Sequence, residues 1–163
     1  MTNEGNQNLT TTVGFEPDEI DTGAPTRSAR LKWVIVVNEA LPPGLAANAA
    51  ICVAATTSAD VAGLLGEGVT DAAGTWHPGL PWAGCSVLVA DAATLRSIRD
   101  RVHPLDDVYA ADMPAAAQQT RVYDEYRAAV AGSPADAIEY YAVSIVGPRN
   151  RVDRIVGRLP LLA

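Results

Sequence analysis

The chain has 163 residues, of which 48% are hydrophobic and 19% are charged. This apolar share can build one core of ordinary domain size, which excludes a wholly disordered chain. Nineteen acidic residues against twelve basic ones give a net charge of −7, so we do not expect nucleic acid as a partner. No apolar run reaches the roughly 18 residues that span a bilayer, and the polar start predicts no secretory leader. We therefore expect a cytoplasmic protein with no membrane partner.

Cysteine and histidine are too scarce for a disulfide framework or a histidine–cysteine metal site. The chain has two cysteines, Cys52 and Cys85, and two histidines, His77 and His103, with no CxxC or HxxxH spacing. We therefore expect no metal and no cofactor, although clusters of Asp and Glu leave a weak cation site open. Both cysteines are interpreted as small core residues, because Cys52 falls in an apolar helix and Cys85 opens a strand.

The start of the chain differs in composition from the rest. Polar residues dominate residues 1–12, which we predict to be a disordered tail. Residues 13–30 form an N-terminal extension, and residues 31–163 form a single α/β domain. Phe15 and Ile20 favour docking of this extension on the domain, and a loose tail is an equal alternative.

The first half of the domain alternates strand and helix patterns. Trp33–Val37 is a continuous apolar run rich in β-branched residues, typical of a strand covered on both faces. Leu45–Thr57 is rich in alanine and predicts a closely packed helix. Gly63–Gly84 has many glycines and turn signals, which predict a loop with a short hairpin. Ser86–Ala90 predicts a second strand, and Asp91 is expected to cap a helix that ends near Arg101.

The second half continues the alternation. Asp107–Ala111 predicts a short third strand that could run in either direction, and Pro114 suits the first turn of a helix extending to about Ala131. Tyr140–Val146 is a strong strand pattern, and a last amphipathic helix follows Gly147 and Pro148. The resulting order predicts an α/β fold with helices on both faces of a short sheet, with connections long enough for parallel crossovers.

The first strand-to-helix junction is the leading candidate site. Asn38 and Glu39 lie at the carboxyl end of the first strand, where open α/β sheets place their ligands. The next helix begins near Gly44, and its free backbone N–H groups favour an anion or a carbonyl oxygen. Asn48 is a polar amide on the first turn of this apolar helix. Alternatively, Asn38 satisfies loop backbone and Asn48 faces solvent.

Three further residues are candidates. His77 lies between Trp76 and Trp82 in the sequence. One interpretation is a general base or a stacking element in a lid, and the alternative is a hairpin tip that aromatic rings hold in place. Asp112 follows the third strand. It is interpreted either as a base or hydrogen-bond acceptor in the site, or as the cap of the next helix. Gln118 lies one turn into that helix.

Several segments carry a family resemblance. The segments GLAANAA and GPRNRVDRIVGRLPLL identify the chain as a member of the bacterial family called domain of unknown function 2000, over about residues 13–162. That family in turn resembles the type-2 peptidyl-tRNA hydrolases of archaea and eukaryotes. The shared features are Lys32 before a strand, Leu41, Gly44, the Ala-Ala-x-Cys step ending at Cys52, and the Gly-x-Leu-x-Leu-Leu ending. The resemblance implies a three-layer α/β/α sandwich with a small mixed sheet, often as a homodimer.

The chain departs from the hydrolases at their chemical residues. Their two lysines, which meet the tRNA and the scissile ester, are matched here by Leu45 and Ala47. The glutamine and histidine that flank their helix cysteine become Ile51 and Ala54. Peptidyl-tRNA hydrolysis by the same mechanism is therefore not expected.

These observations lead to one main hypothesis and two alternatives. The main hypothesis is a small-molecule or aminoacyl-like ligand at the first strand–helix junction, with hydrolase or transferase activity left open. The alternatives are a non-catalytic homodimeric binding or regulatory module, and a tRNA-handling protein that uses the arginines of the last helix. The candidate ligand contacts are Asn38, Glu39, Asn48, His77, Asp112 and Gln118.

Overall fold

A four-stranded mixed sheet forms the centre of the molecule. The computed structural model describes residues 12–163, so nearly all of the tail predicted at residues 1–12 lies outside the described residues. The strand order is β4-β1-β6-β5. The strands are β1 (Leu31–Asn38), β4 (Ser86–Ala90), β5 (Tyr109–Pro114) and β6 (Tyr140–Pro148).

Only one strand pair of this sheet is parallel. β1 pairs with β4 in parallel, and β6 is antiparallel to both β1 and β5. The expectation of parallel crossovers therefore holds for the β1–β4 connection alone. β5 and β6 are consecutive strands and pair antiparallel, because the segment between them reverses the direction of the chain. β6 therefore lies between β5 and β1 in the sheet.

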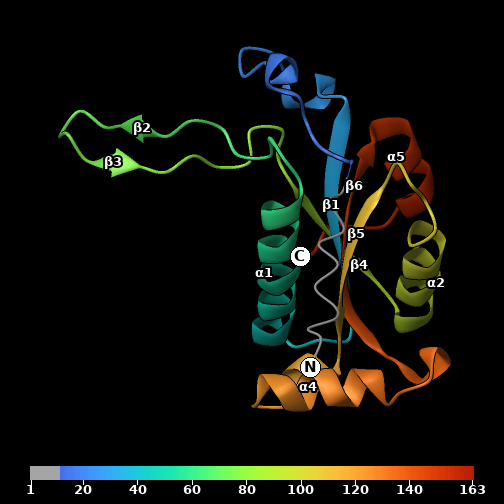
Figure 1. The fold of residues 1–163 in the computed structure, drawn as a ribbon. Coiled ribbons are helices and arrows are strands. Elements are labelled where there is room, and N and C mark those ends of the chain that lie inside the picture. The colour runs from blue at the N-terminus through green and yellow to red at the C-terminus, as the bar shows by residue number, and fades with distance from the viewer. Residues whose placement is uncertain (1–11) are drawn as a thin grey trace, which may run out of the picture.

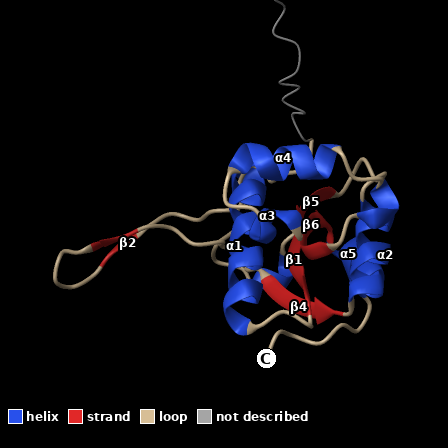
Figure 2. Cartoon of the chain, turned by 90° about the horizontal axis from the view of Figure 1, so that it is seen from below, coloured by secondary structure: helices blue, strands red, loops and turns tan. Residues whose placement is uncertain are grey.

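Helices cover both faces of the sheet, in three layers (Figures 1 and 2). α1 (Pro43–Asp60) packs on one face, and α2 (Ala92–Val102) and α5 (Arg149–Val156) pack on the other. Side chains alternate along β1, as a strand requires. Trp33, Ile35 and Val37 join the core beneath α1, whereas Val34 and Val36 join the core beneath α2 and α5.

Most helix predictions agree with the structure, and one is wrong. Asp91 caps α2 as expected, because its carboxylate accepts a hydrogen bond from the Thr94 N–H at 2.7 Å. The single helix predicted from Pro114 to Ala131 is instead two helices, α3 (Ala116–Gln119) and α4 (Tyr123–Ala131). Pro114 belongs to β5, and Thr120 adopts an extended backbone between the two helices. β-branched residues favour that conformation, which explains the break.

The N-terminal extension lies against the domain. Val13 and Phe15 are buried, and the Phe15 N–H donates to the Ala62 carbonyl at 2.9 Å. The Phe15 ring also lies 4.9 Å from the ring of Trp82, centroid to centroid. Arg30 fastens the extension, because its guanidinium donates to the carboxylate of Glu19 at 2.7 Å and to the Gly14 carbonyl at 2.9 Å.

Residues 65–81 form a hairpin that projects from the domain, and we call it the arm (Figure 1). Its strands are β2 (Val69–Thr70) and β3 (Trp76–His77), which bears out the predicted short hairpin. At its base, the Gly66 N–H donates to the Leu80 carbonyl at 2.9 Å. The two chains approach so closely there that a Cβ on Gly79 would lie 1.8 Å from the Gly66 carbonyl oxygen. Only glycine fits at this position.

The C-terminal residues protect an edge of the sheet. The Val89 N–H donates to the Pro160 carbonyl at 3.0 Å, and the Leu162 N–H donates to the Val87 carbonyl at 2.9 Å. These bonds cover part of the outer edge of β4, which would otherwise present unpaired backbone groups. Within residues 12–163, no helix combines the length and the apolar character needed to cross a membrane.

Candidate functional site

Asn48 and Gln118 meet although they lie far apart in the sequence. The Gln118 side-chain amide donates to the Asn48 Oδ1 and to the Leu45 carbonyl, each at 3.0 Å. Asn48 faces away from the sheet because the buried side of α1 carries Ala46, Ala49 and Val53. α3 follows β5 directly and therefore lies beside the first turns of α1. The contact fixes the orientation of the Asn48 amide.

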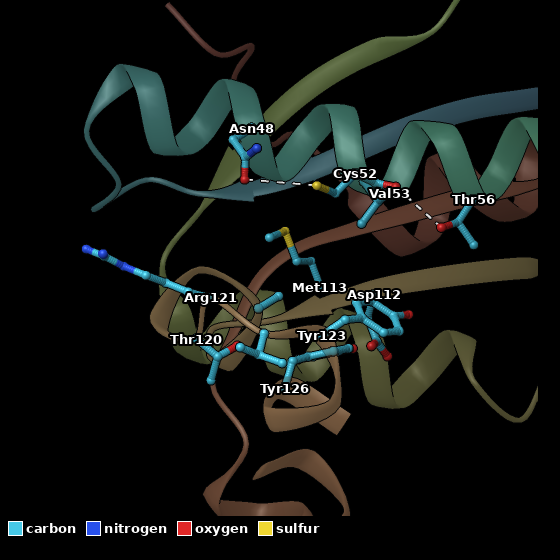
Figure 3. A pocket seen from close by; sticks show the side chains of 12 residues that line it. Asn48, Cys52, Val53, Thr56, Asp112, Met113, Thr120, Arg121, Tyr123 and Tyr126 are labelled. Atoms are coloured by element: carbon cyan, nitrogen blue, oxygen red, sulfur yellow. Dashed lines mark hydrogen bonds between the residues drawn. The ribbon is translucent and has the colours of Figure 1, made fainter. Parts of the chain in front are cut away.

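A cavity of about 440 Å³ lies next to this contact, between α1, β5 and the α3–α4 segment. Figure 3 shows the Asn48 amide and the Cys52 thiol on the α1 side, with Tyr123 and Tyr126 on the opposite side. The lining residues are Asn48, Cys52, Val53, Thr56, Asp112, Met113, Ala117, Thr120, Arg121, Val122, Tyr123 and Tyr126.

Asp112 lines the cavity as one member of an ion pair. Its Oδ2 accepts a hydrogen bond from Arg99 Nε of α2 at 2.9 Å. The same guanidinium lies 5.1 Å from the centre of the Tyr140 ring, which supports its position. Asp112 lies inside β5, and Ala115 holds the cap position of α3, so Asp112 does not cap that helix. Its carboxylate oxygens can accept further hydrogen bonds from a ligand.

Tyr126 contributes a hydroxyl that stays protonated. Burial raises its pKa, and the neighbouring Tyr123 and Asp112 raise it further. A phenol with a raised pKa keeps its proton throughout the neutral range and can donate a hydrogen bond. The cavity therefore offers a hydroxyl donor at one wall and the Asn48 amide at the other.

Asn38 and Glu39 lie outside this cavity. Asn38 is 4% exposed, and its Oδ1 accepts a hydrogen bond from the Ala40 N–H at 3.0 Å. This is the geometry of the alternative in which Asn38 satisfies loop backbone. Glu39 is exposed, and its backbone N–H continues the β1–β4 pairing by donating to the Ala90 carbonyl.

His77 lies on the arm and is not brought to Asn48. Its Nε2 is 3.4 Å from Asp71 Oδ2 near the tip of the arm, and both side chains are exposed. Trp82 anchors the base, because its Nε1 donates to the Gly63 carbonyl at 2.8 Å. Trp76 remains exposed on the arm. In the described part of the chain, no cluster of three or more His, Cys, Asp or Glu residues could hold a metal ion.

Sequence reasoning missed several lining residues and misplaced both cysteines. Cys52 and Cys85 are exposed, which corrects the expectation of two core thiols. Cys52 lies on the side of α1 that faces the cavity, with its Sγ 4.0 Å from the Asn48 Oδ1. The spacing of Asn48, Cys52 and Thr56 follows the i, i+4 repeat of a helix, and this repeat could have identified one wall. Arg121, Tyr123 and Tyr126 could not be placed, because the predicted helix had no break.

The fold and the site define a mixed α/β sandwich with a cavity beside its first helix. The chain belongs to the family described as "Protein of unknown function (DUF2000)", whose model matches residues 31–163. A similar solved structure is that of Atu0240, a protein of unknown function from Agrobacterium tumefaciens strain C58. It is 20% identical, with a TM-score of 0.67, covering 82% of this chain and 98% of that chain. This likeness concerns the fold. No functionally curated protein matches the chain.

Proposed function

We propose that the protein binds a small-molecule or aminoacyl-like ligand in the cavity between α1 and the α3–α4 segment. The observation that carries the proposal is the cavity itself, with the Asn48 amide held at its wall by Gln118. Its volume of about 440 Å³ lies within the range of ordinary ligand sites. A polar amide that is fixed before binding loses little freedom when a ligand arrives, which favours affinity.

The lining indicates the chemistry of the ligand. Val53, Met113 and Ala117 supply an apolar surface that suits an aliphatic or aromatic body. Asn48 can donate and accept hydrogen bonds, and the Tyr126 hydroxyl can donate one. Arg121 is the cation among the lining residues, and Figure 3 shows its side chain reaching away from the others. We infer a ligand that places an apolar body and a hydrogen-bonding group inside the cavity and extends an anionic end, such as a carboxylate, outward to the exposed Arg121.

We also propose a fold like that of the type-2 peptidyl-tRNA hydrolases, a homodimeric state and a cytoplasmic location. The mixed four-stranded sheet with helices on both faces supports the first of these. Any hydrolase or transferase chemistry here would differ from theirs, because Leu45 and Ala47 cannot replace the two lysines.

A thermal-shift screen tests the binding proposal. Compounds with an apolar body and a carboxylate should raise the melting temperature of the wild type by mass action, with about 2.7 kcal/mol of stabilisation at 100 times Kd. Asn48→Ala should abolish this shift. Asn150→Ala is a matched control, because Asn150 is exposed on α5, on the other face of the sheet. Equal shifts in Asn48→Ala and wild type, or no active compound, would contradict the proposal.

A further inference from the structure

α4 is held to the domain more weakly than the other long helices. It has no buried residue, whereas α1, α2 and α5 each bury three or four. Within the described residues, α4 forms no hydrogen bond or ion pair with another helix or strand. Its side-chain contacts of this kind are internal, because Arg127 pairs with Asp124 at 3.3 Å and the rings of Tyr123 and Tyr126 lie 5.5 Å apart, centroid to centroid. Segments with few buried apolar contacts open locally at low free energy.

Hollows lie on two sides of α4. Figure 1 shows the helix lying across one end of the sheet, below α1. The candidate cavity of about 440 Å³ separates its first turns from α1. A second cavity of about 240 Å³ lies between the last turn of α4, the start of α3 and the segment that leads into β6. Protein interiors normally have few such voids. α4 therefore has space to shift without displacing core side chains.

Short connections without helical structure join α4 to the chain at both ends. Thr120 and Val122 have extended backbones before the helix begins. Gly132 ends the helix, and a turn follows it. Connections of this kind, at the ends of elements, are where a hinge absorbs changes in backbone angles. α4 can therefore move as a unit about residues 120–122 and 132–134.

Two large side chains at the start of α4 line the cavity and are nevertheless exposed. Val122 is 53% exposed and Tyr123 is 74% exposed. A movement of the first turn of α4 towards α1 narrows the cavity and brings both side chains onto its contents. Removal of their apolar surface from water favours this closed form when a ligand with an apolar body fills the cavity.

We propose that α4 is a lid, which moves about the two connections and closes the cavity over a ligand by bringing Val122 and Tyr123 towards Cys52 of α1. This inference rests on the proposed function, because the lid acts on the same cavity. The free protein samples the closed form as a minor state. A ligand that contacts Val122 and Tyr123 only in the closed form increases the population of that form.

A disulfide trap tests the closure in the free protein. Two cysteines form a disulfide only when their Cα atoms come within about 7 Å of each other. Cys52 and Tyr123 lie on opposite sides of the cavity (Figure 3), so a bond between these positions requires the lid to close. In a Cys85→Ser background, mild oxidation of Tyr123→Cys with copper–phenanthroline should form a disulfide with Cys52. Mass spectrometry measures it as the loss of both free thiols in a monomer.

Glu125→Cys in the same background is the matched control. Glu125 is exposed on the first turn of α4 but does not line the cavity, so closure does not bring it to Cys52. Its two thiols should stay free under the same oxidation. The absence of a disulfide in Tyr123→Cys, or equal disulfide formation in both variants, would overturn the lid.

Hydrogen exchange of the unmodified chain measures the opening of α4 directly. At one pH, the α4 amides should have protection factors at least about tenfold lower than those of α2, which is of similar length but has three buried residues. Equal protection of the two helices would overturn the lid. Neither experiment uses a ligand. An active compound in the thermal-shift screen together with a failed trap would therefore remove the lid and keep the proposed function, whereas a successful trap with no active compound would support the lid movement and contradict the proposed function.

Discussion

Ser144 joins three elements of the core through one hydroxyl. It is fully buried on β6, and its Oγ accepts a hydrogen bond from Trp33 Nε1 of β1 at 2.9 Å. The same oxygen lies 2.7 Å from the Thr57 hydroxyl of α1. Thr57 in turn donates to the Val53 carbonyl at 2.7 Å. Buried polar groups that satisfy one another in this way fix how α1 sits on the sheet.

We predict that Ser144→Ala lowers the free energy of unfolding by about 1–3 kcal/mol, because it leaves the buried indole N–H of Trp33 without its acceptor. Urea denaturation followed by far-ultraviolet circular dichroism measures the change. Ser97→Ala is the control, because Ser97 is exposed on α2. Its effect should stay within about 0.5 kcal/mol. A Ser144→Ala protein as stable as the Ser97→Ala protein would show that the network contributes nothing.

Glu19 gives the N-terminal extension a dependence on pH. Hydrogen bonds from the Arg30 side chain, and then from the Glu16 backbone, lower the pKa of Glu19 from 4.5 to about 2. Because the pKa is lower in the folded protein, the stabilisation is present above pH 4.5 and is lost as the pH falls towards 2. We predict that the protection factor of the Phe15 amide, which corrects its exchange rate for the intrinsic effect of pH, falls as the pH drops through this window in wild type. Hydrogen exchange by nuclear magnetic resonance at pH 5 and pH 2.5 provides the measurement.

Glu19→Gln is the matched variant for this experiment. The glutamine keeps the size of the side chain but has no carboxylate to titrate, so the pH-dependent loss of Phe15 protection should be smaller than in wild type. The same change of exchange with pH in both proteins would assign the effect to other carboxylates.

At the scale of elements, the sequence predicted correctly those strands and helix caps that depend on interactions between residues close together in the chain. Ser86–Ala90 and the Asp91 cap were predicted correctly, because a β-branched run and a capping carboxylate act over a few residues. The break at Thr120 and Val122, which are both extended, was missed because no glycine or proline marks it. The turn signals of residues 65–81 predicted a hairpin but not its projection. The direction of a hairpin depends on packing at its base, where Trp82 meets Phe15.

The extension makes a prediction for limited proteolysis. The polar composition of residues 1–12 predicts rapid cleavage there, whereas Phe15 is 5% exposed and bonded to Ala62. A protease of broad specificity should therefore trim the chain to about Thr12 and then pause, as seen by mass spectrometry. In Phe15→Ser the pause should disappear and cleavage should continue towards Arg30. Immediate cleavage to Arg30 in wild type would show that the extension does not hold to the domain.

At the scale of the whole molecule, the candidate site depends on contacts that no local pattern contains. Asn48 and Gln118 were each proposed from their own surroundings, but their hydrogen bond exists only because α3 returns to the first turns of α1. Asp112 comes to the edge of the same cavity because β5 is an outer strand. His77 was grouped with them by residue type, and the arm carries it elsewhere. Chain topology therefore decides which candidates can share a ligand, and the roles of all six remain predictions.

The overall charge and the α1 sequence together make a prediction for tRNA. A net charge of −7 opposes binding of a polyanion. At the positions where type-2 peptidyl-tRNA hydrolases have lysines, this chain has Leu45 and Ala47, and both are exposed on α1. We therefore predict that the purified protein releases no amino acid from N-acetyl-aminoacyl-tRNA above background, in an assay where a true type-2 hydrolase serves as the positive control. Turnover comparable with that control would mean that the chain hydrolyses the ester without lysines, and it would replace the small-molecule proposal with tRNA as the substrate.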